Sequence, residues 1–150
     1  MNPYHPGKTQ FEEIQAFALW VYLVMAVGLA LSFETVITQP LLFTPLVVVL
    51  LLAANLLCER TTVDDEVVVS FGWLFPLYRR RIRLTEVASA EAVTYSALIE
   101  YGGWGIRGMG KNVALNARGN RGVRLHLQNG NRVLIGSQRP EELAAAIAAR

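Results

Sequence analysis

The sequence predicts a membrane-anchored α+β protein, in which a two-helix transmembrane hairpin precedes a β-rich domain that ends in one helix. Two apolar runs, residues 16–33 and 40–57, contain no charged side chain. Beyond residue 60, apolar and polar residues alternate, as they do in strands with one buried face. The chain has 150 residues, enough for one small domain and an anchor but not for two full domains.

The overall composition agrees with a membrane anchor. Hydrophobic residues make up 53% of the chain and charged residues 17%, against roughly 25% charged in typical soluble proteins. The net charge of +2 is too small to predict a nucleic-acid partner. Cys58 is the only cysteine and the chain has two histidines, so we expect no disulfide, no metal site and no cofactor.

Each apolar run is long enough for a transmembrane helix. A helix over residues 16–33 rises about 27 Å, close to the ~30 Å hydrocarbon core of a bilayer. A signal peptide cleaved near Ala30–Ser32 is the alternative, but Glu12 and Glu13 precede the run and argue against it. A buried helix pair is disfavoured because neither run shows a polar face.

The flanking charges predict the orientation of the hairpin. Residues 34–39 connect the two helices and contain no Lys or Arg, whereas Arg60 and a cluster of arginines follow the second helix. By the positive-inside rule, this predicts a multi-pass inner-membrane protein with both termini in the cytoplasm. The expected division is a cytoplasmic tail (1–15), the hairpin (16–58) and a β domain (60–150).

The β domain is predicted to contain six or seven short antiparallel strands and a C-terminal helix. Asn129-Gly130, between two alternating apolar runs, predicts a two-residue type I′ hairpin. Pro140 begins the helix, with two glutamates in its first turn. The expected strands lie near residues 61–71, 77–84, 86–95, 113–117, 122–128 and 133–135, with a short one at 104–107.

The order of several segments is informative: the two apolar runs, Gly-Trp-Gly-Ile-Arg at 103–107, and Val-Leu-Ile-Gly-Ser-Gln-Arg-Pro-Glu-Glu-Leu at 133–143. In this order the chain resembles bacterial pleckstrin-homology-like (PH-like) domain proteins with two N-terminal transmembrane helices. The resemblance implies a PH-like seven-stranded β sandwich or barrel closed by one helix, and a binding or assembly role without enzymatic activity. It implies no ligand site, because residues 72–76 are apolar where phosphoinositide-binding PH domains have a basic loop.

Two phosphate-binding motifs match the glycine-rich segment that follows residue 100. Residues 103–108 fit G-x-G-x-x-G, and residues 105–111 fit G-x-x-x-x-G-K, but Asn112 stands where a P-loop needs Ser or Thr. Both motifs also need a following helix, and the turn-forming residues after Asn112 predict none. We therefore expect a loop rather than a nucleotide site. Its candidates for contact with a protein partner are Trp104, Arg107 and Lys111.

Candidate lipid-binding residues lie on one strand and on the turn before it. Arg79, Arg81 and Arg83 share one face of the strand, where they would attract anionic headgroups. The alternative is a solvated face paired with the acidic residues 64–66. The preceding apolar turn either inserts among headgroups or packs onto the sheet through its aromatic residues, Trp73 and Phe75.

These features predict a non-enzymatic, membrane-anchored module for protein–protein or protein–lipid assembly at the cytoplasmic face. The expected partners are membrane lipids and either an unknown protein or a second copy of the chain. An enzyme is disfavoured because His126 is the only histidine after residue 60, so no Ser-His-Asp or Cys-His arrangement can form in the β domain. The alternative is an accessory subunit of a membrane enzyme or transporter complex.

Overall fold

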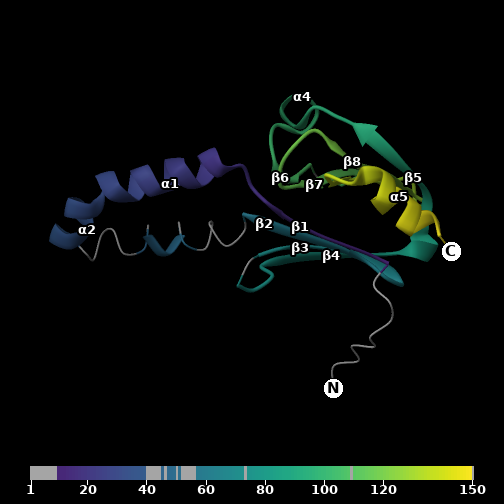
Figure 1. Cartoon of the computed structure of the whole chain (residues 1–150), viewed down its shortest axis with the longest axis horizontal. Helices are drawn as coiled ribbons and strands as arrows, with labels where there is room; N and C mark the ends of the chain where they lie inside the picture. Colours follow the sequence, from purple (N-terminus) through teal and green to yellow (C-terminus); the bar gives the residue numbers. More distant parts are fainter. Residues whose placement is uncertain are drawn as a thin grey trace, which may run out of the picture.

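The computed structural model of the chain is an α+β fold with two β-sheets (Figure 1). It describes residues 10–39, 45, 47–49, 51, 57–72, 74–108 and 110–149. Both sheets contribute apolar side chains to one core that lies between them. This arrangement is stable because each sheet buries one face of alternating apolar residues.

The first sheet is an antiparallel meander in chain order: β1 (Phe11–Ala16), β2 (Cys58–Val63), β3 (Glu66–Phe71) and β4 (Tyr78–Arg83). Alternate residues of β1 and β3 are buried, as the period of two requires. Gly72 begins the turn between β3 and β4 with φ 140°, and a Cβ there would lie 2.0 Å from the carbonyl oxygen of Phe75. The turn therefore requires glycine.

The second sheet has the order β5 (Val87–Thr94), β8 (Arg121–Leu127), β9 (Arg132–Gly136), β7 (Asn112–Asn116) and β6 (Gly105–Arg107). The β7–β9 pair is parallel and the other pairs are antiparallel. A 3-10 helix, Leu84–Glu86, connects the two sheets. The described residues thus contain nine strands, more than the seven predicted, and the all-antiparallel arrangement is wrong for β7 and β9.

The hairpin predicted at Asn129-Gly130 is confirmed, but its turn is of another kind. His126 and Arg132 are the last paired residues of β8 and β9, so the connection is longer than two residues. Gly130 has φ 80°, whereas Asn129 does not have the positive φ that a type I′ turn requires. The Asn129 side chain instead accepts a hydrogen bond from the N–H of Asn131 at 3.0 Å, as in an Asx turn.

The predicted C-terminal helix is confirmed as α5 (Pro140–Ala148). Pro140 lies at its first position, where the missing N–H costs no hydrogen bond. Leu143 and Ile147 lie one turn apart and are both buried in the core. The helix packs against β5 and β8, so it covers one side of the space between the sheets (Figure 1).

A second, smaller apolar cluster lies on the outer face of the second sheet. Ala114 and Leu134 point away from the main core, because their neighbours along β7 and β9 belong to it. The short helix α4 (Ala97–Tyr101) covers them, together with Tyr95. This face of the sheet is therefore only partly open.

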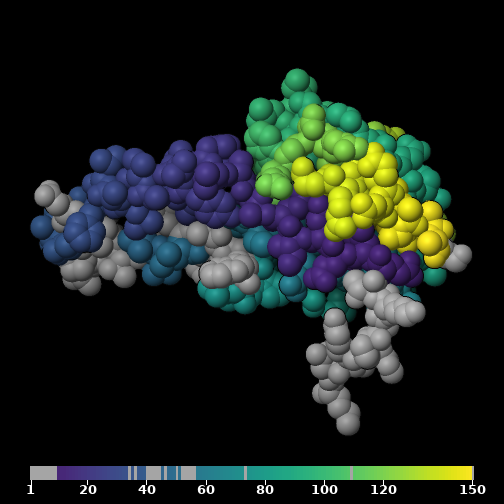
Figure 2. Space-filling view, in the orientation of Figure 1, coloured from purple at the N-terminus to yellow at the C-terminus, as the bar shows by residue number. Residues whose placement is uncertain are grey.

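A helical arm is inserted between β1 and β2, although these strands are neighbours in the first sheet. It begins with the helices α1 (Leu19–Leu31) and α2 (Phe33–Thr38), and residues 19–38 are called the arm. The arm projects from the two-sheet body (Figures 1 and 2). At its base, the N–H of Phe17 and the hydroxyl of Tyr22 each donate to the carbonyl oxygen of Leu57 at 3.0 Å.

The predicted transmembrane hairpin is wrong: among the described residues, no helix is both long enough and apolar enough to cross a membrane. The apolar run 16–33 is divided, because Ala16 ends β1 and Ser32 ends α1. The Ser32 hydroxyl donates to the carbonyl oxygen of Gly28 at 2.8 Å and so competes for a helix acceptor. The 13 residues of α1 rise about 20 Å, short of a bilayer core.

Two further expectations depended on that hairpin. The second predicted helix, residues 40–57, lies largely outside the described residues. The assignment to an inner membrane, with both termini cytoplasmic, is overturned together with the hairpin.

The predicted N-terminal tail, residues 1–15, also includes a strand. Phe11–Ala16 form β1, which pairs with β2 along its whole length. The strand was not predicted because two of its buried positions are polar, Glu13 and Gln15, and only Phe11 signals a buried face.

Candidate functional site

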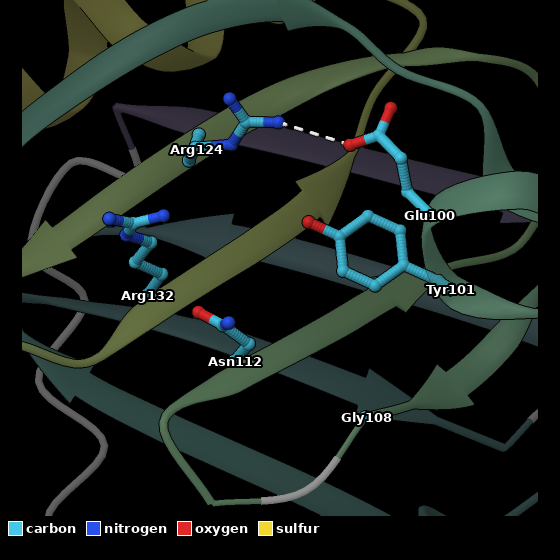
Figure 3. A pocket seen from close by; sticks show the side chains of 6 residues that line it. All are labelled: Glu100, Tyr101, Gly108, Asn112, Arg124 and Arg132. Carbon is cyan, nitrogen blue, oxygen red and sulfur yellow. Dashed lines mark hydrogen bonds and ion pairs between the residues drawn. The ribbon is translucent and has the colours of Figure 1, made fainter.

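An open cleft of about 680 Å³ lies on the outer face of the second sheet, beside α4 (Figure 3). The cleft is bounded by two elements, the sheet surface and the helix that partly covers it. Its lining residues are Glu100, Tyr101, Gly108, Asn112, Arg124 and Arg132.

Strand register brings the polar side chains of the cleft together. Arg132 on β9 pairs with His126 on β8 and with Asn112 on β7, so the three residues form one row across the sheet. Arg124 lies on the same face as His126, two residues earlier on β8, while Val123 and Leu125 face the core. Figure 3 shows the two arginines and Asn112 on adjacent strands, facing Glu100 and Tyr101.

The wall formed by α4 is held by local hydrogen bonds. The Ser96 hydroxyl accepts a hydrogen bond from the N–H of Ile99 at 3.3 Å, which caps the helix. Glu100 Oε1 accepts from the N–H of Ser96 at 2.8 Å, and Glu100 Oε2 lies 3.4 Å from Arg124 Nη2. Tyr101 packs edge-to-face against Tyr95, with 6.1 Å between the ring centroids.

The loop residues predicted to contact a partner fall into different environments. Trp104 is half-buried against the outer apolar cluster, and its Nε1 donates to the carbonyl oxygen of Gly119 at 3.0 Å. Arg107 is exposed on β6 and donates through Nε to the carbonyl oxygen of Trp104 at 2.9 Å. Lys111 is exposed. It lies next to the cleft, because its carbonyl oxygen accepts a hydrogen bond from the N–H of Arg132, which lines the cleft. Of the three, Lys111 is the residue that adjoins the cleft.

The glycine-rich segment does not have the structure of a phosphate loop. Gly105–Arg107 form strand β6, and the segment continues into strand β7 rather than into a helix. A Cβ on Gly108 would lie 2.2 Å from the carbonyl oxygen of Asn112, so this glycine allows two backbone segments to approach closely.

The predicted basic face lies on the first sheet. Arg79, Arg81 and Arg83 are all exposed on the outer face of β4. Arg83 donates to Glu86 at 2.7 Å, so its acidic partner follows it in the chain instead of lying within 64–66. Phe75 is exposed in the turn before β4, and Trp73 lies outside the described residues.

A buried carboxylate lies between the sheets, away from both surfaces. Glu59 on β2 is fully buried, and Thr61 Oγ1 donates to its Oε1 at 3.4 Å. Its Oε2 has no hydrogen-bond partner among the described residues. Burial raises the pKa of Glu59 well above its usual range, and the nearby Glu13 carboxylate raises it further, while a hydrogen bond from the Ala117 backbone opposes the shift.

Sequence reasoning missed both the cleft and the buried carboxylate. Arg124 and His126 lie on the outward face of β8, but nothing local in the sequence brings Glu100 and Tyr101 to that face. A usable signal was the outward Arg132 directly after the hairpin, since hairpin pairing places it opposite His126.

The chain matches no protein-family model, and comparison with curated proteins and with solved structures gives no match. The resemblance to bacterial PH-like domains therefore stays a prediction.

Proposed function

We propose that this chain is a non-enzymatic assembly module that associates with a second copy of itself through the arm. The observation that supports the proposal is a row of exposed apolar side chains along α1. None of the residues of α1 is buried in the single chain. Such a contiguous apolar surface typically marks an interaction site.

The spacing of the exposed residues favours a helix as the partner. Trp20, Val24, Val27 and Leu31 follow one another at intervals of four, three and four residues, which is the spacing of the core positions of a coiled coil. They are 59%, 64%, 56% and 80% exposed, and we call them the seam. An α1 helix from a second copy, packed antiparallel across a two-fold axis, would cover all of them.

The charge pattern favours a second copy over an unrelated partner. α1 contains no charged residue, so a second α1 helix can pack on it without like-charge repulsion and without burying an unpaired charge. Complete burial of the eight seam side chains of a dimer is worth at most about 12–24 kcal/mol. The cost of association is about 4–15 kcal/mol, so burial of the seam can supply enough free energy for a stable dimer.

Sedimentation equilibrium of the full chain tests the proposal. We expect a dimer for the wild-type chain and a monomer for Val27→Glu, which buries a charge at the centre of the seam. Ala26→Glu is the matched control, because Ala26 is exposed on α1 but lies outside the seam. It adds the same charge and should leave the dimer intact.

Two results would refute this assignment. One is a wild-type monomer at micromolar concentration, and the other is equal dissociation of both variants. If a monomeric wild-type chain instead binds anionic vesicles, the lipid partner predicted from the sequence takes the place of the second copy.

A further inference from the structure

We propose that the cleft on the outer face of the second sheet binds a ligand through a carboxylate group. The inference is independent of the arm and rests on cationic and neutral donors that face one opening (Figure 3). The carboxylate belongs either to a small organic acid or to the C-terminus of a peptide, and the experiment below separates these sources.

Arg132 is the principal donor. Its side chain is exposed at the edge of the cleft, and its guanidinium has no hydrogen bond or ion pair within the part of the chain that the structure describes. The backbone of Arg132 is fixed on both sides, because β9 pairs with β8 and with β7. A guanidinium on a rigid strand is well suited to bind a carboxylate through two parallel N–H···O bonds.

Glu100 orients the side chain of Arg124 but does not use all of its hydrogen-bond donors. The Arg124–Glu100 pair spans 3.4 Å, and the two side chains are 30% and 41% exposed, so the interaction is weak. The other oxygen of Glu100 is already used by the N–H of Ser96. Glu100 thus holds the guanidinium of Arg124 toward the cleft and leaves other N–H groups of Arg124 for a ligand.

Charge favours a monoanion over a dianion in this cleft. The two arginines and Glu100 give the lining one net positive charge. A single carboxylate balances that charge, whereas a doubly charged phosphate would leave the occupied cleft with one net negative charge. Asn112 and Tyr101 add neutral donors, and about 680 Å³ is within the usual size of small-ligand sites.

Calorimetric titration of the full-length chain with simple probes tests the proposal. Hippurate carries a carboxylate, an amide and a ring, hippuramide lacks only the charge, and phenyl phosphate replaces the carboxylate. We expect hippurate to bind in about the millimolar range, more weakly as salt rises, and hippuramide not to bind. The peptide Ala-Ala-Phe and its C-terminal amide are titrated in parallel. Tighter binding of the free peptide than of hippurate identifies a chain end as the ligand, and the reverse order identifies a small acid.

Substitutions locate the binding to the cleft. Arg132→Gln should weaken hippurate binding about tenfold, because it removes the charged, two-point contact. Arg79→Gln is the control, since Arg79 is also exposed but lies on the first sheet. Circular dichroism should show both variants folded, as exposed arginines contribute little to stability. The proposal is overturned if phenyl phosphate binds more tightly than hippurate, if no carboxylate binds, or if the two variants behave alike.

Discussion

The buried Glu59 makes a strong prediction about how stability depends on pH. Its pKa in the folded chain is raised well above the unfolded value near 4.5, chiefly by burial. Between these two pKa values the folded chain keeps the proton and the unfolded chain releases it. Unfolding therefore releases one proton, and the free energy of unfolding falls by about 1.4 kcal/mol for each unit of rising pH.

Replacement of Glu59 by Gln removes this titration while keeping the size and shape of the side chain. The new amide group needs a partner at the position of Oε2, so the absolute stability can shift in either direction. The informative quantity is the difference in unfolding free energy between the wild-type chain and the variant. It should fall by about 1.4 kcal/mol per pH unit from about pH 5 up to the folded pKa.

Urea denaturation at half-unit steps between about pH 5 and pH 8 measures this difference, because the midpoint and slope give the free energy directly. Glu12→Gln is the control: Glu12 is half-exposed on β1 and pairs with Arg60 at 3.5 Å, so its removal should cost less than about 1 kcal/mol. The reasoning fails if the Glu59→Gln difference stays constant with pH, or if Glu12→Gln reproduces its slope.

Two further predictions concern packing, and urea denaturation at one pH measures both. Gly136→Ala should lower the free energy of unfolding by about 1–3 kcal/mol, because its Cβ would lie 2.7 Å from the Cβ of the buried Asn116. A Cβ added at Gly28 would have no neighbour within 4 Å, and Gly28 lies within α1, so Gly28→Ala should raise the free energy of unfolding by about 0.5–1 kcal/mol. Equal losses of stability at Gly136 and Gly28 would contradict the steric argument. Leu143→Ala should cost about 2–5 kcal/mol because this side chain is fully buried. Leu98→Ala, at a 64% exposed site, should change stability by less than about 0.5 kcal/mol, and a larger loss there than at Leu143 would refute the placement of the core.

Local signals in the sequence predicted local structure well. Asn129-Gly130 marked a hairpin and Pro140 marked the start of a helix, because each signal acts on the few residues beside it. The alternation of Arg79, Arg81 and Arg83 placed them on one strand face for the same reason.

Features that depend on distant residues were not predictable in this way. The parallel pairing of β7 with β9 joins strands that β8 separates in the chain, and no turn signal announces such a pairing. The cleft likewise needs α4 to fold back over strands that follow it. The apolar run 16–33 was wrongly predicted to be one transmembrane helix, because hydropathy alone does not show where a strand or a helix ends. In the structure Ala16 belongs to a strand and Ser32 ends a helix.

The polar side chains of β1 hold the second sheet as well as the first. Glu13 accepts hydrogen bonds from the hydroxyl of Ser137 at 2.6 Å and from the N–H of Gln138 at 3.0 Å, in the connection between β9 and α5. Gln15 Nε2 donates to the carbonyl oxygen of Gly136 at 2.9 Å. The strand that leads into the arm therefore also fastens the two sheets together.

This position has a consequence for the order in which the chain assembles. Strands β2, β3 and β4 are joined by short turns, whereas 41 residues separate Ala16 at the end of β1 from Cys58 at the start of β2. Pairing of β1 with β2 therefore closes a long loop. Closing a longer loop costs more entropy, so we expect β1 to dock last in folding and to detach first in local opening. When β1 detaches, the arm loses one of its two attachments to the body. Hydrogen exchange should thus show the amides of β1 exchanging together with the amide of Gln138, which donates to Glu13, and ahead of the amides in β8 and β9.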